Sequence, residues 1–498
     1  MEFVKKLQES IEKHASHNVL CIQGKFYTYT DFALQVSNIR VAIKETVRDS
    51  EKLIGLVTND DIQTYASIIA LWLEGKAYVP VNPEVPVERN FTIFELTETK
   101  YVIDSSKKTV YEDYTVIASG TIKKTSQIDL IPKEYSGDQL AYILFTSGTT
   151  GLPKGVPITF DNIQGLVNAI EAEPKFNLLP SDRCLQMFEL TFDFSVVTYL
   201  FPLLSGSCMY TIPKGAIKYF YIFKLIKEEK LTVLTMVPSI INYLRPYFSE
   251  INAPDVRYCS FGGGALHSDI AKEWSDCLPN CTIFNYYGPT EFTVYSGFYP
   301  YHKDTDNKSH NGIIAIGTPQ KDTLYLVVDQ ENQEVPIGET GELCLAGPQI
   351  TSGYWKNKEK NAQSFFTRNE NGKEIRYYKT GDLCFKDEEG DHLYVGRADF
   401  QVKIRGYRVE LAEIEFHAKE KSQKKVNIVA LDIINDLGNA ELGLAIESEA
   451  FDTNEIFEYL RVKVPNYMIP MHVRFIKEFP HSINGKIDRK ELRKHFNI

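Results

Sequence analysis

Apolar residues recur along this chain with two different periods. Short runs of β-branched and aromatic residues, such as 52–58 and 231–237, alternate with longer segments whose apolar residues fall three or four positions apart, such as 31–45 and 62–75. The first pattern predicts strands and the second predicts amphipathic helices. Their regular alternation predicts an α/β fold.

The pattern changes in the last third of the chain. From about Gly312 to Val395 short strands are separated by Gly, Asp and Asn turns, which predicts a small β-rich subdomain. Beyond residue 396 the chain becomes richer in Lys and Glu, with helical patterns at 411–421 and 456–464 around a strand at 426–433. We therefore expect a domain boundary near Asp399, with residues 1–398 in one domain and residues 399–498 in another.

One apolar segment has the length of a membrane span. The residues between Asp193 and Lys214 carry no charge, but Pro202 and Gly206 interrupt them. This pattern predicts a buried helix followed by a strand, with no membrane insertion. The first 18 residues read as an amphipathic helix and lack the apolar core of a signal peptide, so we expect a cytoplasmic protein.

Composition narrows the functional classes. A chain of 498 residues with 43% hydrophobic and 24% charged residues is typical of a folded protein with two or more domains. Its formal net charge of −11 argues against general binding of nucleic acid or anionic membranes. Eight scattered cysteines indicate free thiols in a reducing compartment. Cys277 and Cys281 lack a second Cys/His pair, so they are interpreted as ordinary thiols.

The segment YILFTSGTTGLPKG, residues 142–155, combines an apolar run with a loop of small residues that ends at Lys154. Such a loop exposes backbone NH groups and hydroxyls, which suit polyphosphate oxygens, and the lysine adds a positive charge. The spacing does not fit a Walker loop, because Leu152 and Pro153 separate the second glycine from the lysine. Taken alone, the segment is equally compatible with an ordinary surface loop.

Five further motifs follow this loop in the chain. They are FDFS (192–195), NYYGPTE (285–291), YKTGDL (378–383), GRADFQVKIRGYRVELAEIE (396–415) and NGKIDRKEL (484–492). Together and in this order, the six motifs resemble the ANL superfamily of adenylate-forming enzymes. They are most similar to its amino-acid adenylation branch, which includes nonribosomal peptide synthetase adenylation domains and D-alanine carrier protein ligases. The resemblance covers nearly the whole chain and implies the ANL fold, with a large N-terminal domain of βα-rich and β subdomains and a small mobile α+β C-terminal domain.

The resemblance also implies an ATP site. Tyr287 would stack on adenine, Thr290 would contact the α-phosphate, Asp382 would accept the ribose hydroxyls beside Arg397, and Glu291 would help to hold Mg²⁺. The ATP-binding residues implied are Thr146, Ser147, Gly148, Thr149, Thr150, Lys154, Gly262, Gly263, Asn285, Tyr286, Tyr287, Gly288, Pro289, Thr290, Asp382, Tyr394, Arg397 and Lys486.

Three of the implied catalytic and hinge residues lie in the C-terminal part. Lys486 would bridge the substrate carboxylate, the ribose and the α-phosphate, and would stabilise the charge that develops there. Asp399 would be the hinge about which the C-terminal domain rotates, and Lys403 would replace Lys486 for a second half-reaction. Thr290 completes the implied catalytic set.

The amino-acid pocket is expected around Asp193 of FDFS, whose carboxylate would bind the substrate ammonium. The alternative is a helix N-cap aspartate, which would leave amino-acid specificity unsupported. The implied substrate-binding residues are Asp193, Phe194, Val197, Ser239, Ser260, Gly262, Tyr286, Val294, Tyr295 and Lys486. Their aromatic side chains favour a small substrate such as D-alanine, alanine, glycine or serine, whereas Gly262 removes a side chain and favours a roomier pocket.

The predicted function is therefore the ATP- and Mg²⁺-dependent adenylation of an amino acid, followed by transfer to a carrier protein. The chain stops six residues after the NGKIDRKEL motif, so the phosphopantetheine-bearing carrier is expected to act in trans. Two alternatives remain. An acyl- or aryl-coenzyme A ligase is disfavoured by Asp193, and a nucleotide-binding regulator without catalysis is disfavoured by Lys154, Glu291, Asp382 and Lys486.

Overall fold

The computed structural model describes residues 2–123, 125–148, 152–399, 401–422, 426–481 and 487–496. The chain divides into two compact units. Unit 1 consists of Met1–Asn82, Phe94–Leu144 and Gly155–Ala398, and unit 2 consists of Pro83–Ile93, Phe145–Lys154 and Asp399–Ile498. Unit 2 therefore combines the C-terminal part of the chain with two short earlier segments, one of which is the loop rich in glycine and threonine.

The largest sheet of unit 1 has nine strands in the order β17-β14-β13-β12-β11-β9-β10-β1-β2. Its central strands pair in parallel, and its outer strands β2, β14 and β17 pair antiparallel. Parallel strands are covered on both faces, which explains their nearly continuous apolar sequences. The strands are Asn18–Ile22 (β1), Lys25–Thr28 (β2), Arg183–Gln186 (β9), Cys208–Thr211 (β10), Val233–Met236 (β11), Tyr258–Phe261 (β12), Thr282–Tyr287 (β13), Gly297–Tyr301 (β14) and Thr318–Pro319 (β17).

A second sheet has six strands in the order β6-β5-β3-β4-β7-β8. Strands β3 to β7 pair in parallel where their register is resolved, as the alternation of strands and helices in the sequence predicts. Its strands are Leu53–Val57 (β3), Ala77–Val81 (β4), Tyr101–Asp104 (β5), Thr115–Ala118 (β6), Leu140–Thr146 (β7) and Lys154–Thr159 (β8). The loop rich in glycine and threonine connects β7 to β8.

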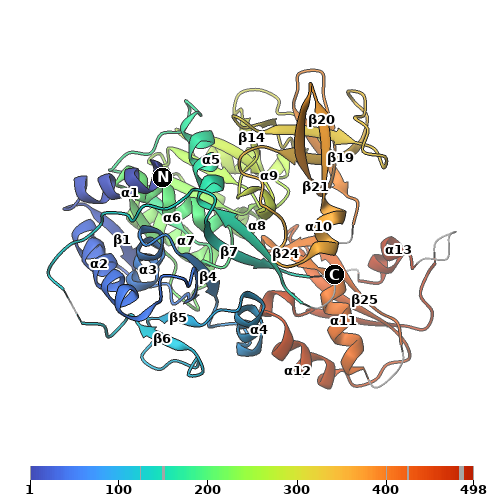
Figure 1. Ribbon diagram of the computed structural model, residues 1–498. Helices are drawn as coiled ribbons and strands as arrows, with labels where there is room; N and C mark the ends of the chain where they lie inside the picture. The colour runs from blue at the N-terminus through green and yellow to red at the C-terminus, as the bar shows by residue number, and fades with distance from the viewer. Residues whose placement is uncertain are drawn as a thin grey trace. The chain divides into compact units, whose positions relative to one another are not determined.

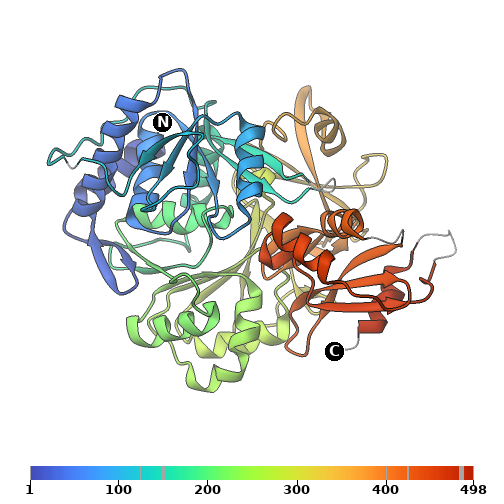
Figure 2. The ribbon, with the colours of Figure 1, turned by 90° about the horizontal axis from the view of Figure 1, so that it is seen from below.

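The helices that accompany these sheets begin where the sequence supplies caps. The longest, α2, starts with a capping box in which Thr28 and Asp31 each accept a hydrogen bond from the other's backbone NH. Helices α7 and α8 lie side by side (Figure 2). The helices are Glu2–Lys13 (α1), Tyr29–Thr46 (α2), Ile62–Leu73 (α3), Val87–Thr97 (α4), Phe160–Glu171 (α5), Phe194–Ser205 (α6), Lys218–Lys224 (α7), Pro238–Leu244 (α8), Ser268–Cys277 (α9) and Lys358–Ser364 (α10).

Helices α3 and α6 share one hydrophobic core with both large sheets. Trp72 of α3 packs against Tyr199 of α6 with ring centroids 6.0 Å apart. The Tyr199 hydroxyl lies 2.9 Å from the hydroxyl of Tyr78 on β4, and both side chains are fully buried. Because α6 is anchored in this way, the residues at its beginning are held in a fixed position.

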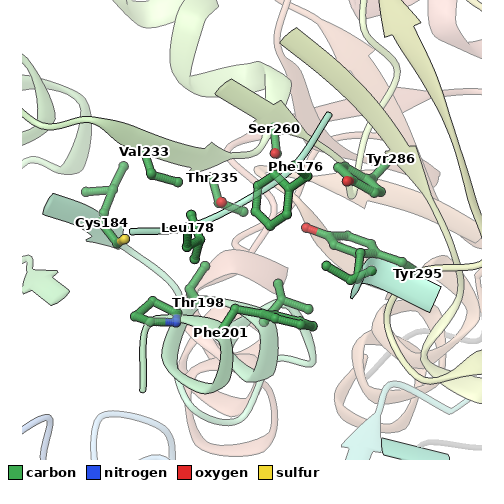
Figure 3. A pocket seen from close by; sticks show the side chains of 14 residues that line it. Phe176, Leu178, Cys184, Thr198, Phe201, Val233, Thr235, Ser260, Tyr286 and Tyr295 are labelled. Atoms are coloured by element: carbon green, nitrogen blue, oxygen red, sulfur yellow. The ribbon is translucent and has the colours of Figure 1, made fainter. Parts of the chain in front are cut away.

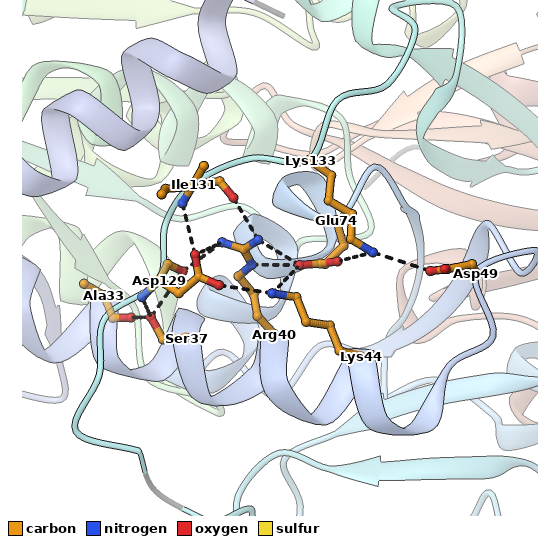
Figure 4. A network of polar contacts seen from close by, with 9 residues as sticks. All are labelled: Ala33, Ser37, Arg40, Lys44, Asp49, Glu74, Asp129, Ile131 and Lys133. Carbon is orange, nitrogen blue, oxygen red and sulfur yellow. Dashed lines mark hydrogen bonds and ion pairs between the residues drawn. The ribbon is translucent and has the colours of Figure 1, made fainter.

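A buried network of ion pairs joins α2 to the end of α3 (Figure 4). The carboxylate of Glu74, which is fully buried, lies 2.8 Å from Arg40 and 2.8 Å from Lys133. Arg40 also binds Asp129 at 3.0 Å. Burial alone would raise the pKa of Glu74, but the hydrogen bonds from Lys133 and Arg40 outweigh it and hold that pKa below its ordinary value.

The β-rich region predicted between Gly312 and Val395 is a separate five-stranded sheet of unit 1. Its order is β18-β19-β21-β20, with β22 also pairing with β21, and Figure 1 shows β19, β20 and β21 side by side. The strands are Leu324–Val328 (β18), Gly341–Ala346 (β19), Phe365–Glu370 (β20), Lys373–Lys386 (β21) and His392–Arg397 (β22). Two short strands that precede this sheet in the sequence, Ser309–His310 (β15) and Ile313–Ile314 (β16), pair with each other.

The described residues of the C-terminal part of unit 2 form a β-hairpin, a three-stranded sheet and three α-helices. Its strands are Gln401–Ile404 (β23), Tyr407–Glu410 (β24), Ile428–Ile434 (β25), Ala440–Glu447 (β26) and His472–Ile476 (β27), and its helices are Leu411–Lys421 (α11), Asn454–Lys463 (α12) and Arg489–Arg493 (α13). Helix α11 coincides with the helix predicted at 411–421. Its apolar face packs with β25 and β26 in a core of its own.

The uncharged segment after Asp193 forms helix α6 and strand β10, as predicted. Pro202 lies inside the helix, and Gly206 ends it in the left-handed conformation that glycine adopts without strain. Among the helices that the structure describes, none combines the length and the apolar character needed to cross a bilayer.

Candidate active site

Asp193 stands at the beginning of α6 but does not cap it. Its backbone is already helical and its side chain makes no capping hydrogen bond. The carboxylate instead accepts a 2.7 Å hydrogen bond from the Thr290 hydroxyl, and the side chain is buried with 5% of its surface exposed. The N-cap alternative is therefore wrong, because a tertiary contact from a loop 97 residues away holds this carboxylate.

Aromatic side chains pack against one another around the beginning of α6. Phe194 stacks on Phe192 and meets Tyr295 edge to face, with centroids 5.7 and 5.2 Å apart. Tyr295 stacks in turn on Tyr286 at 4.2 Å. A methyl group added at Gly262 would overlap the Phe194 ring. The expectation that Gly262 enlarges the pocket is therefore wrong, because the ring of Phe194 occupies the space that the glycine leaves.

Four of the predicted substrate-binding residues, Val197, Ser260, Tyr286 and Tyr295, line one cavity between α6 and the strands β9, β11, β12 and β13 (Figure 3). The rest of its lining is mainly apolar. The Tyr286 hydroxyl is buried without a hydrogen-bond partner among the described residues. Burial raises the pKa of Tyr286, so the phenol stays protonated. The predicted residue Ser239, on α8, does not line this cavity.

Thr290, Glu291 and Tyr295 lie in one strained turn. A short 3₁₀ helix, Thr290–Phe292, is followed by Thr293 and Val294, both with positive φ, which is unusual for β-branched residues. Gln349 holds the turn, since its side-chain amide donates to the Tyr295 carbonyl at 2.5 Å and its main-chain carbonyl accepts from the Thr293 hydroxyl at 2.6 Å. This over-determined backbone is the kind that persists at functional sites.

The predicted adenine and ribose residues are in direct contact. The Tyr287 hydroxyl donates to Asp382 at 2.5 Å, and Arg397 donates to the other carboxylate oxygen at 2.7 Å. Thr380 fixes the strand here by donating to the Leu343 carbonyl and accepting from the Asp382 NH. Burial, reinforced by the Asp382 carboxylate, raises the pKa of Tyr287 well above its usual value, so the phenol keeps the proton that it donates.

Glu291 has a fully buried side chain and accepts a 2.6 Å hydrogen bond from the Tyr354 hydroxyl. The Tyr378 hydroxyl lies 3.3 Å from the Tyr354 hydroxyl. A single oriented carboxylate fits a Mg²⁺ ion that takes its other ligands from phosphate and water. Among the described residues there is no cluster of three or more His, Cys, Asp or Glu that could hold a metal by itself.

The remaining predicted nucleotide residues of unit 1 lie on neighbouring elements. Asn285 is buried on β13, and its amide donates to the Ala315 carbonyl at 2.9 Å. Gly263 has a positive φ. Gly288 and Pro289 join β13 to the 3₁₀ helix, and a Cβ at Gly288 would overlap the Val294 carbonyl. Tyr394 is half-buried on β22.

The loop of unit 2 binds to carboxylates of its own unit. Gly148 NH donates to Glu413 at 3.0 Å, and Lys154 binds Glu410 at 2.8 Å. The Ser147 hydroxyl donates to the Arg408 carbonyl and accepts from the Glu410 NH. Arg89 holds the other oxygen of Glu413 at 2.7 Å. In this conformation Gly148 and Lys154 are therefore engaged with carboxylates, and Ser147 is engaged with main-chain groups.

For the remaining predicted residues, the structure gives mainly their positions in the fold. Thr146 ends β7, Lys403 is exposed on β23, and Asp399 begins the last segment of unit 2 and accepts a hydrogen bond from the Gln401 NH at 3.1 Å. Thr149, Thr150 and Lys486 lie outside the described residues. Their implied roles are not tested by the structure.

The residues in these contacts that are not predicted from the sequence include Tyr354, Gln349, Thr380, Arg89, Glu410 and Glu413. Each acts through a partner that is distant in sequence, such as Tyr354 with Glu291, 63 positions away. Thr380 and Glu413 stand inside quoted motifs, YKTGDL and the 396–415 segment, so those motifs supplied a signal for them. Tyr354 and Gln349 belong to no motif considered above.

Comparison with known proteins supplies the context for this geometry. Residues 7–355 match the family model described as AMP-binding enzyme. D-alanine--D-alanyl carrier protein ligase from Lacticaseibacillus paracasei is 30% identical over 497 residues, covering 96% of each chain. Tyrocidine synthase 3 from Brevibacillus parabrevis is 29% identical over 500 residues, but this chain spans only 8% of its length. The Vibrio cholerae adenylation domain AlmE, solved in complex with glycyl-adenosine-5'-phosphate, has a TM-score of 0.87 at 24% identity, covering 99% of this chain and 97% of that one, so the two share a fold.

Proposed function

Because the chain belongs to the AMP-binding enzyme family, we propose that it is an AMP-forming ligase that activates an amino acid. The amino-acid carboxylate attacks the α-phosphorus of ATP, forming an acyl–phosphate bond while the bond to the leaving pyrophosphate breaks. A phosphopantetheine thiol on a carrier protein, supplied in trans, then attacks the acyl carbon and AMP leaves. The relatives that ligate D-alanine to a carrier protein support both half-reactions.

The observation that carries the choice of substrate class is the position of Asp193. A carboxylate buried among aromatic rings, with a hydroxyl donor at 2.7 Å, suits the ammonium group of an amino acid. A fatty or aryl acid has no such cation. Asp193 therefore favours amino-acid activation over an acyl- or aryl-coenzyme A ligase.

The packing around Asp193 supports a small substrate. Phe194 occupies the space beside Gly262, and Tyr286 and Tyr295 are stacked on each other. A side chain of leucine or tryptophan size would have to displace one of these rings, and such displacements cost about 1–3 kcal/mol each. We therefore favour glycine, D-alanine, alanine or serine.

ATP is the proposed nucleotide. Tyr287, Asp382 and Arg397 would bind adenosine, Thr290 the α-phosphate, and the loop residues Ser147, Gly148 and Lys154 the outer phosphates. When bound, Mg²⁺ would be held by Glu291 and would neutralise charge on the phosphates. We assign Lys486 as the catalytic cation, Lys403 as its replacement in the second half-reaction and Asp399 as the hinge between them, all from the motif resemblance.

We place the enzyme in the cytoplasm, because all eight of its cysteines are free and buried. The experiment that tests the proposed function is pyrophosphate exchange into ATP, measured with each standard amino acid and with D-alanine. We expect exchange with a small amino acid, and transfer of that amino acid to a carrier protein. Exchange only with fatty or aryl acids would replace the proposal with a coenzyme A ligase, and no exchange with any acid would indicate a nucleotide-binding regulator.

A further inference from the structure

A hydrogen bond connects the two halves of the proposed substrate site. The Thr290 hydroxyl donates to Asp193 at 2.7 Å, and both side chains are buried. Under the proposed function these residues serve different substrates, because Thr290 faces the α-phosphate of ATP and Asp193 faces the ammonium of the amino acid. Their direct contact means that the two sites compete for one donor.

The competition follows from the chemistry of a hydroxyl group. Threonine carries one O–H proton, and both an ionised carboxylate and an ionised phosphate can only accept. The Thr290 proton can therefore serve Asp193 or a phosphate oxygen, but not both as full hydrogen bonds. Its oxygen can stay in place during the exchange, because the proton turns about the Cβ–Oγ1 bond.

The surrounding backbone keeps this donor at its position. Thr290 begins the 3₁₀ helix, and its carbonyl accepts from the Thr293 NH at 3.2 Å, just before the two residues with positive φ. On the other side, Asp193 is fixed at the start of α6 without a capping bond to the helix. Exchange of the proton thus requires no rearrangement of either main chain.

We propose that Thr290 couples the two substrates through this exchange. The ammonium group of the amino acid, which brings a positive charge and three N–H donors, replaces the Thr290 hydroxyl at Asp193. The released hydroxyl then donates to the α-phosphate. This inference rests on the proposed function and adds to it that the Thr290 hydroxyl donates to the α-phosphate only when an ammonium is bound at Asp193.

Two consequences follow. A hydrogen bond to a charged group contributes about a tenfold to hundredfold gain in affinity, so the amino acid should tighten nucleotide binding by about tenfold. Because coupling is reciprocal, the nucleotide should tighten amino-acid binding by the same factor. A carboxylic acid without an amine does not release the hydroxyl, so the coupling would discriminate against such acids at the nucleotide step.

The test is calorimetric titration of the full chain with α,β-methylene-ATP, which cannot be cleaved at the α-phosphate. The titration is run alone, with saturating glycine or D-alanine, whichever supports pyrophosphate exchange, and with the matching acid that lacks the amine, acetate or propionate. We expect about tenfold tightening with the amino acid and none with the acid. Equal tightening by both ligands would overturn the inference.

Three variants separate coupling from structure. Thr290→Val keeps the shape but removes the hydroxyl and should abolish the tightening, whereas Thr290→Ser keeps the hydroxyl and should retain it. Asp193→Asn keeps an acceptor but removes the charge, and should also abolish the tightening. Coupling that persists in Thr290→Val, or that is lost in Thr290→Ser, contradicts the proposal.

Should Thr290→Val fail to fold, Thr290→Ser and Asp193→Asn still decide the question. Failure of the proposed function gives a different result. Absence of exchange with every amino acid would remove both proposals, whereas exchange with unchanged coupling in the variants would remove only this one.

Discussion

The candidate site of unit 1 and the loop of unit 2 both contain buried carboxylates, but different donors bind them. In unit 1, Asp193 and Glu291 accept from the hydroxyl groups of Thr290 and Tyr354, and Asp382 accepts from the Tyr287 hydroxyl on one oxygen and from Arg397 on the other. In unit 2, Glu410 binds Lys154, and Glu413 binds Arg89 and a backbone NH. Hydroxyl protons can turn to another acceptor at little cost, whereas a buried ion pair is broken only at the cost of an unpaired charge.

The two regions therefore differ in how easily a ligand can replace the groups that now bind the carboxylates. Asp193 and Glu291 of unit 1 are positioned by hydroxyl donors that a ligand can replace. Among the described residues of the unit 2 loop, Gly148 and Lys154 are engaged by carboxylates of the same unit, so their proposed role with phosphates requires Glu413 and Glu410 to give up those donors. Four sets of substitutions can break or sharpen this contrast.

The largest effect is expected for Asp193→Asn. Asparagine still accepts from Thr290 but offers no charge to the substrate ammonium, and removing one partner of a buried charge pair costs about 3–5 kcal/mol. The kcat/KM for the amino acid should fall by at least about 100-fold. Steady-state pyrophosphate exchange at varied amino-acid concentration measures this loss.

A matched control is Asp182→Asn, which removes a buried carboxylate bound to Arg257 at 2.6 Å. It should lower the melting temperature while leaving the KM for the amino acid unchanged. Wild-type kcat/KM in Asp193→Asn would show that this carboxylate does not bind the substrate.

Glu74 of unit 1 is bound by cations, as Glu410 and Glu413 of unit 2 are. Its partners are Arg40 and Lys133 (Figure 4). Glu74→Gln should destabilise the fold by about 3 kcal/mol at neutral pH, because it leaves the buried Arg40, and the exposed Lys133, without this partner. Since the pKa of Glu74 is lowered by folding, its ionised form stabilises the protein above its unfolded pKa, and that contribution is lost as pH falls through the lowered folded pKa.

Thermal unfolding at pH values from 7 down to 3 tests this assignment. The wild type should lose more stability on acidification than Glu74→Gln does, and the two curves should converge at the acid end. The KM values for both substrates should not change in the variant at neutral pH. Parallel curves over the whole range would contradict an ion-paired Glu74.

A smaller effect is expected from a pair of substitutions in the pocket. Gly262→Ala places a methyl group against the Phe194 ring and should destabilise the protein by about 1–3 kcal/mol. In a Phe194→Ala background the same change should be nearly harmless, because the ring is gone. Melting temperatures of the two single variants and the double variant give the coupling energy.

The same variants test the proposed size limit. Phe194→Ala should shift the preference towards larger amino acids by about 10- to 100-fold in relative kcat/KM, since a hydrophobic pocket discriminates by about 1–3 kcal/mol per group. Additive destabilisation by Gly262→Ala and Phe194→Ala, or unchanged selectivity, would mean that this ring does not limit the pocket.

Much of the fold follows from local patterns. The α/β alternation, the helix at 411–421 and the helix and strand after Asp193 are confirmed, because each depends on periodicity and on residues within one element. The candidate site follows from the sequence only in part. Asp193, Thr290, Asp382 and Glu291 were named from motifs, but no pattern showed that Thr290 binds Asp193 or that Phe194 fills the space beside Gly262. These contacts join segments about 70–100 residues apart, where local sequence carries no signal of the partner.

The smallest effect is expected in the loop of unit 2, for Glu410→Gln. Glutamine keeps an oxygen for Gln401, which donates to Glu410 at 2.9 Å, but removes the charge that engages Lys154. If Lys154 binds the outer phosphates, it should then be more available to them, and the KM for ATP should fall by about three- to tenfold, or about 1 kcal/mol. Glu415→Gln is the matched control, because Glu415 lies on α11 and pairs with Arg489 at 2.7 Å, with no hydrogen bond to the described residues of the loop. A KM for ATP that rises in Glu410→Gln, or that falls equally in both variants, would indicate that Glu410 supports the loop and does not compete with phosphate for it.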